Sequence, residues 1–305
     1  MRVKQGGILM SIRKYIAYLR TVETGSITQT ANELGYTQSA VSKMIADLES
    51  EWDVRLLNRS RSGIELTSEG VALLPAIRAV VKEYNDLGFA VSELHGIRSG
   101  LLRIGCFTSL STSVLPDLLK SFHESYPKIR IQLTNGEYEE IAQWLRRGAI
   151  DCAFLALPAA PEFEATFLLR DSFVAILPEG HPLADEPVFA VKHLAETDFV
   201  KLNELPDTEV DRFLDSLPIQ PRVTYEATND FALLAMVESG LGVSIVHDLI
   251  LHPRRYHVVR RPLDVTHSRD VGLCVRRDAP PSSITKLFLS HVLANAAKLS
   301  AFAEI

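Results

Sequence analysis

The chain has 305 residues, of which 47% are hydrophobic and 23% charged, and a formal net charge of −6. This length exceeds one ordinary core and predicts two or three domains, while the composition excludes collagen-like and disordered proteins. No apolar run reaches the roughly 18 to 20 residues that span a bilayer, and the N-terminus lacks an apolar signal region, so we expect a cytoplasmic protein without a membrane partner.

The charge is distributed unevenly along the chain. Residues 1–62 hold nine Lys or Arg against six Asp or Glu, a net charge of +3, which leaves −9 for the remainder. A small basic module beside an acidic remainder is typical of a protein whose first part meets phosphates. The charge distribution therefore favours a nucleic-acid partner for the N-terminal part.

The first fifty residues predict three helices. Apolar side chains at three- and four-residue spacing over residues 12–22 form the first helix, which stops at Gly25. Ser26 caps a second helix that ends at Gly35, and Thr37 caps a third. Two helices joined by so short a turn cross steeply, so this order predicts a helix-turn-helix.

The first turn of the third helix carries short polar side chains. Gln38 can pair with an adenine edge or donate to a phosphate, and Lys43 can reach a phosphate. An ordinary capped, solvated helix is the alternative, but Ala31, Gly35 and Val41 follow in the order that a helix-turn-helix needs. The candidate DNA-contacting residues of the three helices are Ser26, Thr28, Thr37, Gln38, Ser39, Ser42 and Lys43.

A β-hairpin is expected after the third helix. The segment "WDVRLLNRSRSGIELTSEG" alternates into two short strands around the turn "SRSG". Arg59 and Arg61 project from this hairpin, which has the form of a wing resting on the sugar-phosphate backbone. Loops often carry exposed arginines, but beside a helix-turn-helix the wing is the favoured interpretation.

The run "TGSITQTANELGYTQSAVSKMIADLESEWDVRLLNRSRSGIELTSEG" resembles the N-terminal domain of LysR-type transcriptional regulators. The resemblance implies a winged helix-turn-helix DNA-binding domain over residues 1–66. The chain departs from the family pattern at Ala40, where proline is frequent, at Lys43, where arginine is usual, and at Thr30, where alanine is usual. Ten residues precede the family's customary start, so Met10 is a candidate initiator.

One long helix is expected over residues 67–96, because apolar side chains recur there at alternating four- and three-residue steps. Such a seam packs against a second helix, here the same helix of another copy. A helix packed on its own domain is the alternative, and Pro75 and Gly88 weaken an ideal coiled coil. The family resemblance implies a dimerising linker, hence a homodimer or a dimer of dimers on an inverted-repeat site. The seam residues are Leu73, Ile77, Val80, Tyr84, Leu87, Val91 and Leu94.

Residues 97–305 follow a hinge at 96–100 and alternate short apolar strands with helical patterns. The order strand-helix-strand-helix-strand over residues 101–157 predicts a parallel sheet with right-handed crossovers. A second α/β set follows, after which the strand "RDVGLCVRRD" and the helix from Pro281 return to the first. We expect two lobes: lobe I over 100–160 and 267–300, and lobe II over 161–266.

The phrases "VAILPEGHPLA" and "VESGLGVSIV" resemble the effector-binding domain of the same regulators, which is similar to periplasmic solute-binding proteins. In such folds the ligand lies between the lobes. The hydroxyls and helix start of "CFTSLSTS" suit a carboxylate or other anion, although capping alone is an alternative. From these anion-binding groups we expect the effector to be a small organic acid or related metabolite. No arginine stands out as a carboxylate partner, however, and Glu137 favours an amine or hydroxyl on the ligand. The candidate effector-binding residues are Thr108, Ser109, Ser111, Glu137, Asn203 and Asn229.

The sequence lacks the common motifs of catalysis and metal binding. The sequence has no GxSxG elbow, no GxGxxG after a strand, no Walker lysine and no HExxH spacing, and its three cysteines form no CxxC pair. We therefore expect reduced buried thiols, no metal, no cofactor and no enzymatic activity. His247 replaces a proline common in the family, and we favour a satisfied or solvated histidine over the alternative, a residue that lines the cleft.

The combined expectation is a sequence-specific DNA-binding transcriptional regulator whose DNA binding or promoter activity is modulated by a small-molecule effector between two lobes. The alternative is a cytosolic solute-binding or sensor protein without DNA activity. That alternative accounts for residues 100–300 but not for the basic first 62 residues.

Overall fold

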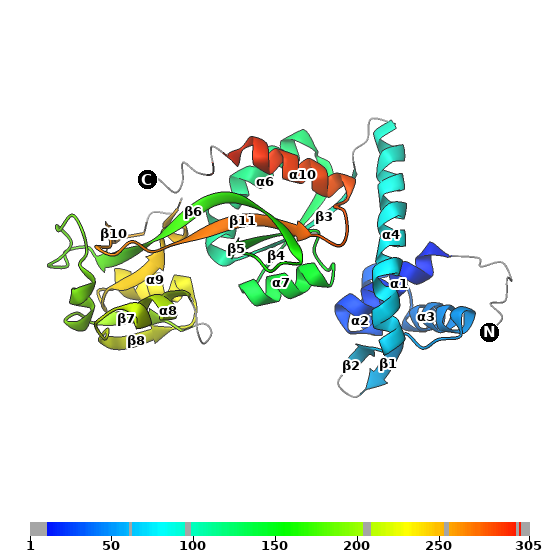
Figure 1. The fold of residues 1–305 in the computed structure, drawn as a ribbon, viewed down its shortest axis with the longest axis horizontal. Coiled ribbons are helices and arrows are strands. Elements are labelled where there is room, and N and C mark those ends of the chain that lie inside the picture. Colours follow the sequence, from blue (N-terminus) through cyan, green and yellow to red (C-terminus); the bar gives the residue numbers. More distant parts are fainter. Residues whose placement is uncertain are drawn as a thin grey trace.

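The computed structural model describes residues 11–60, 63–94, 99–203, 209–252, 256–296 and Leu299. A helical N-terminal module, a long helix and a two-lobed α/β part follow one another in space (Figure 1). No helix within the described ranges is long and apolar enough to cross a membrane. The candidate initiator Met10, the wing residue Arg61 and positions 96–98 of the expected hinge lie outside the described residues.

The N-terminal module is a winged helix-turn-helix, as expected. Its core is formed where helices α1, α2 and α3 meet the start of α4, with Tyr18, Val41 and Leu56 fully buried. The Tyr18 hydroxyl donates to the Gly70 carbonyl at 3.2 Å and ties the first helix to the fourth. The elements are α1 (Ile12–Thr24), α2 (Ile27–Leu34), α3 (Gln38–Trp52), β1 (Leu57–Ser60) and β2 (Gly63–Leu66).

Glycine and hydroxyl side chains set the helix ends of this module. Gly25 and Gly35 end α1 and α2 at φ values of 64° and 69°, where other side chains are strained. The hydroxyls of Ser26 and Thr37 accept hydrogen bonds from the third N–H of α2 and α3, at 3.3 and 3.2 Å. Thr30, a departure from the family pattern, is buried and donates to the Ser26 carbonyl at 2.8 Å.

Helix α4 (Ser68–Leu94) divides the predicted seam into two parts. Leu73 and Ile77 pack in the core of the N-terminal module, so for these two turns the helix packs on its own domain. Phe89, on another face, enters the core of lobe I. Val80, Tyr84, Leu87 and Val91 of the stripe are open to solvent, exposed by 38, 52, 63 and 47%, whereas the side chain of Leu94 lies outside the described part of the chain.

Lobe I has the expected parallel arrangement. Strand β3 pairs in parallel with β4 and β5, and β11 adds to β5 in antiparallel fashion. The sequence predicted one helix after β3, but the structure has two, because α5 ends at Thr112 before α6 begins. The elements are β3 (Ser99–Cys106), α5 (Thr108–Thr112), α6 (Leu115–Ser125), β4 (Lys128–Asn135), α7 (Tyr138–Arg146), β5 (Cys152–Leu157), β11 (Ser268–Arg276) and α10 (Ser283–Ala294).

Two long strands join the lobes. The first part of β6 (Phe163–Pro178) pairs with β11, and its last part pairs with β9 and β10 in lobe II (Figure 1). The sequence placed the boundary between lobe I and lobe II at residue 161. In the structure β6 runs through both lobes, so the lobes meet within this strand and not before it. The other lobe II elements are β7 (Phe199–Leu202), α8 (Glu209–Ser216), β8 (Val223–Ala227), α9 (Asp230–Glu238), β9 (Ser244–His247), β10 (Val258–Pro262) and the short helices Val191–Ala195 and Asp248–Leu251.

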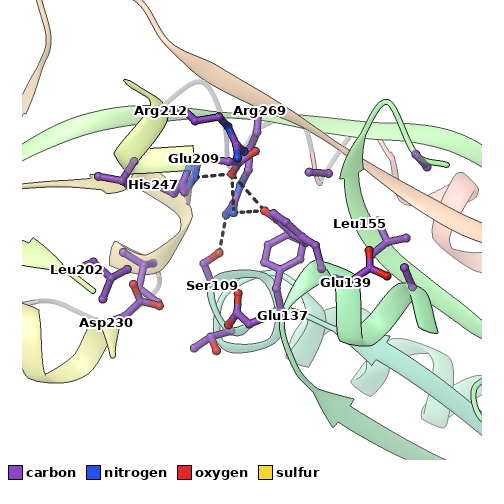
Figure 2. Close-up of a pocket in the computed structure, with 18 of the residues that line it drawn as sticks. Ser109, Glu137, Glu139, Leu155, Leu202, Glu209, Arg212, Asp230, His247 and Arg269 are labelled. Atoms are coloured by element: carbon purple, nitrogen blue, oxygen red, sulfur yellow. Dashed lines mark hydrogen bonds and ion pairs between the residues drawn. The ribbon is translucent and has the colours of Figure 1, made fainter. Parts of the chain in front are cut away.

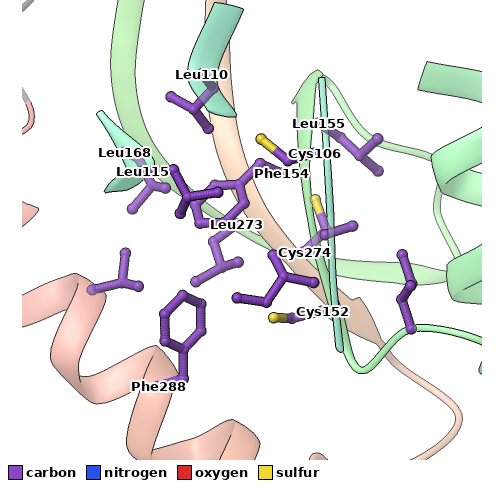
Figure 3. Close-up of a cluster of buried hydrophobic side chains, with 14 of the residues drawn as sticks. Cys106, Leu110, Leu115, Cys152, Phe154, Leu155, Leu168, Leu273, Cys274 and Phe288 are labelled. Carbon is purple, nitrogen blue, oxygen red and sulfur yellow. The ribbon is translucent and has the colours of Figure 1, made fainter. Parts of the chain in front are cut away.

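The three cysteines lie together in the core of lobe I, on neighbouring strands (Figure 3). All three are free and buried, as expected. Burial raises the pKa of the Cys274 thiol to about 12 and raises the pKa of Cys106 and Cys152 as well. Since the thiolate is the reactive form, these groups act as small apolar core residues.

Candidate functional site

The polar first turn of α3 stands on the outside of the N-terminal module. Thr37, Gln38, Ser39 and Lys43 are exposed there. The Thr37 and Ser39 hydroxyls lie 3.0 Å apart, so both are held at the helix start. This end of α3 therefore presents hydroxyl, amide and ammonium groups to solvent, the set that can contact base edges and phosphates.

The remaining candidate DNA contacts flank this turn. Ser26 caps α2 and Thr28 is exposed on its first turn, while Ser42 lies half-buried on α3. Arg59 lies on the wing strand β1 opposite Ile64.

A cavity of about 640 Å³ lies between the two lobes (Figure 2). Lobe I contributes the end of β3, the start of α5 and helix α7, and lobe II contributes α8, the start of α9 and the end of β9. This is the position in which two-lobed folds bind small ligands. Its charged or hydrogen-bonding wall residues are Thr108, Ser109, Glu137, Tyr138, Glu139, Arg146, Glu209, Arg212, Asp230, His247 and Arg269.

A buried ion pair lies where the crossing strands meet the cavity. Arg269 on β11 pairs in register with Asp171 on β6, and both side chains are almost completely buried. Nη2 and Nε of Arg269 donate to Oδ2 of Asp171 at 2.6 and 3.0 Å, and Oδ1 accepts the Leu249 N–H at 3.1 Å. Burial alone would lower the pKa of Arg269, but Tyr138, Asp171 and Glu209 raise it. The Arg269 guanidinium is therefore charged at neutral pH.

The Arg269 guanidinium belongs to a hydrogen-bond network that crosses from lobe I to lobe II. Arg269 donates to the Ser109 hydroxyl at 2.6 Å and to the Tyr138 hydroxyl, and both acceptors belong to lobe I. Tyr138 donates to Glu209 of lobe II at 3.4 Å, and Nε2 of His247 lies 3.0 Å from the same carboxylate. These contacts form one network across the cavity, which the dashed lines of Figure 2 follow. The donors of Arg269 are thus engaged inside the protein.

His247 is part of this network and combines the two interpretations made from sequence. It lines the cavity, and its Nε2 is hydrogen-bonded to Glu209. Burial and the charge of Arg269 lower the pKa of His247, so the ring is neutral at pH 7. Burial would raise the pKa of Glu209, but the hydrogen bond from His247 and the Arg269 charge lower it. Glu209 is therefore ionised and holds the neutral imidazole.

Two carboxylates of the cavity wall have no ion-pair partner among the described residues. They are Glu137, just before α7, and Asp230, at the start of α9. Burial raises the pKa of both. The charge of Glu140 adds to the shift of Glu137 and the charge of Glu137 adds to the shift of Asp230, while the charge of Arg269 opposes the shift at both. Glu139, in contrast, pairs with Arg146 at 3.0 Å.

The predicted effector residues divide into two groups. Thr108, Ser109 and Glu137 line the cavity. Ser111, Asn203 and Asn229 lie outside its wall. There Ser111 accepts from Asn135, Asn203 donates to Glu226 and Asn229 caps α9 through Ala232, all at 2.9 Å.

The sequence interpretation missed Arg269, although the chain holds a signal for it. The dipeptide "RD" occurs in both "LLRDSF" and "HSRDVG". In antiparallel strands these dipeptides pair crosswise, as Arg170 with Asp270 on the outside and Asp171 with Arg269 on the inside. No group of His, Cys, Asp and Glu within the described ranges could hold a metal ion.

The N-terminal module and lobe I touch each other. Arg78 on α4 lies between Glu23 at the end of α1 and the lobe I residue Arg276, and both guanidinium groups point at the Arg146 carbonyl, at 3.5 and 3.4 Å. Burial and the charge of Arg276 lower the pKa of Arg78 to about 10. Further along α4, Asp86 accepts the Ser283 N–H of α10 at 3.1 Å. Helix α7, which carries Arg146, thus faces both the cavity and α4.

Comparisons with known proteins bear on both parts of the chain. The LysR substrate binding domain model matches residues 95–297, and the model of the bacterial regulatory helix-turn-helix protein, lysR family, matches residues 12–71. The HTH-type transcriptional regulator YvbU of Bacillus subtilis is 31% identical over 286 residues, 92% of this chain and 97% of that protein.

Solved structures share the fold. A full-length OxyR variant from Pseudomonas aeruginosa has a TM-score of 0.73 at 20% identity, covering 96% of this chain and 99% of its own. CbnR, a LysR family regulator, complexed with its target DNA has a TM-score of 0.56 at 23% identity, covering 94% and 100%. At these identities the likeness concerns the fold alone.

Proposed function

The chain belongs to the LysR family of transcriptional regulators, and from that premise we propose that α3 and the wing read promoter DNA under the control of a ligand between the lobes. The observation that carries the proposal is the pairing of two sites in one chain. An exposed polar helix start suits the major groove, and a cavity of about 640 Å³ between the lobes suits a small molecule.

The exposed stripe of α4 supports a homodimer. Val80, Tyr84, Leu87 and Val91 form an apolar face of the kind that two helices bury against each other. Two DNA modules on a twofold axis would then read an inverted repeat. A dimer of dimers, a cytoplasmic location and the absence of catalysis complete the proposal, since these fit a protein that works on promoter DNA.

Control by the ligand requires that cavity and DNA module be coupled. Helix α7 offers a route, because Arg146 lines the cavity and its carbonyl faces Arg78 of α4. A ligand that binds better to one arrangement of the lobes would shift α7, and with it the position of the DNA modules. A ligand that binds both arrangements equally would change nothing.

Fluorescence anisotropy of the full chain on its own upstream DNA, beside a scrambled duplex of equal length and composition, tests the proposal. A salt series separates base reading from counterion release. We expect preference for the upstream duplex to persist at physiological salt. Equal binding to both duplexes would refute sequence-specific reading at this site, and no binding to either would favour the alternative, a solute-binding or sensor protein without DNA activity.

A further inference from the structure

The charges in the cavity wall indicate what kind of ligand it takes. Arg269 is engaged with Asp171, Ser109 and Tyr138, and it lies over the Phe107 ring at 4.5 Å. Arg146 is engaged with Glu139 at 3.0 Å and with Glu162 at 2.6 Å. The charge of each guanidinium is therefore already balanced by a carboxylate of the protein. Arg212, the third arginine of the wall, lies near Glu209, and its charge lowers the pKa of that carboxyl.

The carboxylates of Glu137 and Asp230 lack such a counter-ion within the described ranges, although the Glu137 side chain shares the capping box of α7 with Glu140. Each lines the cavity, and neither has an ion-pair partner among the described residues. Figure 2 places Asp230 on the lobe II side and Glu137 on the lobe I side, below Ser109 and the Arg269 network. They are near enough for the charge of Glu137 to raise the pKa of Asp230. Two partly buried negative charges that face one cavity repel each other and are costly to desolvate.

We propose that the effector carries a protonated nitrogen that lies between Glu137 and Asp230. A small amine or an amino acid meets this requirement, and a purely anionic acid does not. The inference rests on the proposed function in one respect, that this cavity is the effector site. It changes the organic-acid class expected from the hydroxyls of the β3–α5 turn to molecules that bear a cationic nitrogen, with or without a carboxylate.

This arrangement links binding to lobe movement. Glu137 belongs to lobe I and Asp230 to lobe II, so a cation between them attracts both lobes at once. In the absence of the cation their mutual repulsion favours separation. The ligand therefore has a higher affinity for the closed arrangement, which is the condition for a shift of the equilibrium.

The first test uses the full chain without any ligand. We compare melting temperatures of the wild type, Glu137→Gln, Asp230→Asn and the double variant at pH 7.5. Each single variant should melt higher than the wild type, and the double variant should gain less than the two gains together, because either change removes the repulsion. Glu139→Gln, which removes a partnered carboxylate from the same wall, should not raise the melting temperature. Melting of both single variants at or below the wild-type temperature would overturn the proposal.

The second test compares three compounds with the same four-carbon chain. These are 1,4-diaminobutane, 4-aminobutanoate and succinate, titrated at millimolar concentrations against the wild type and the double variant. At least one amine should stabilise the wild type, and its affinity for the double variant should fall about 30-fold or more. Stabilisation by succinate alone, or by none of the three, would overturn the inference.

DNA binding is measured on the same samples without compounds. Retained preference for the upstream duplex together with a response to succinate alone would reject the cationic ligand and leave the proposed regulator function intact. Loss of DNA preference in the wild type would count against the function itself.

Discussion

Replacement of Arg269 by leucine should destabilise the effector domain strongly. The change removes the guanidinium that pairs with the Asp171 carboxylate at a site that is 1% exposed, and it removes donors from Ser109 and Tyr138. Breaking a buried ion pair from one side costs about 3 to 5 kcal/mol. For a domain of about 200 residues, this corresponds to a fall in melting temperature of about 6 to 20 °C.

Differential scanning calorimetry of the full chain measures this fall, and the strand pair supplies a matched control. Arg170 pairs with Asp270 one register step away, at 2.6 Å but with Arg170 largely in solvent. Arg170→Leu should therefore change the melting temperature far less. Asp171→Asn combined with Arg269→Leu should recover part of the loss, because no unpaired charge remains. If Arg269→Leu melted no lower than Arg170→Leu, the buried pair would not hold the lobes together as argued.

Four further changes test other parts of the molecule. Gln38→Ala should relax base preference by roughly 1 to 3 kcal/mol, whereas Lys43→Ala should weaken binding to all DNA and lower the salt slope by about one, both measured by anisotropy. Leu87→Glu should convert dimers to monomers in sedimentation velocity, and Ala79→Glu, off the exposed stripe, should not. Because the pKa of Asp230 is raised in the folded chain, ionised Asp230 destabilises it. The stabilisation by Asp230→Asn should thus be largest at pH 8 and decline as the pH falls through that pKa.

Local sequence signals predicted the elements of the N-terminal module and the exposed polar first turn of α3. Gly25 and Gly35 can take the left-handed conformation, and Ser26 and Thr37 can cap helices, whatever the rest of the chain does. The βαβ order of lobe I was predictable for the same reason, since short apolar strands alternate with amphipathic helices over a continuous stretch. These features depend on neighbours within a few residues.

The cavity depends instead on residues that are distant in sequence. Arg269 and Asp171 are 98 positions apart and meet through the register of β6 with β11. The helix pattern likewise left open which part of the α4 stripe faces solvent. Ile77 and Leu87 both belong to the apolar repeat, but only Ile77 is covered by the N-terminal module, and Leu87 is exposed. Asn203 and Asn229 were plausible cleft residues by type, yet both bond elsewhere.

DNase I footprinting of the full chain on its own upstream region tests the central claim most directly. We expect protection of two half-sites related by twofold symmetry, spaced by about one helical turn or a multiple of it, and loss of the base-specific pattern with Gln38→Ala. Uniform protection along the fragment, or an unaltered footprint with Gln38→Ala together with Ser39→Ala, would contradict the account of α3 as the reading helix.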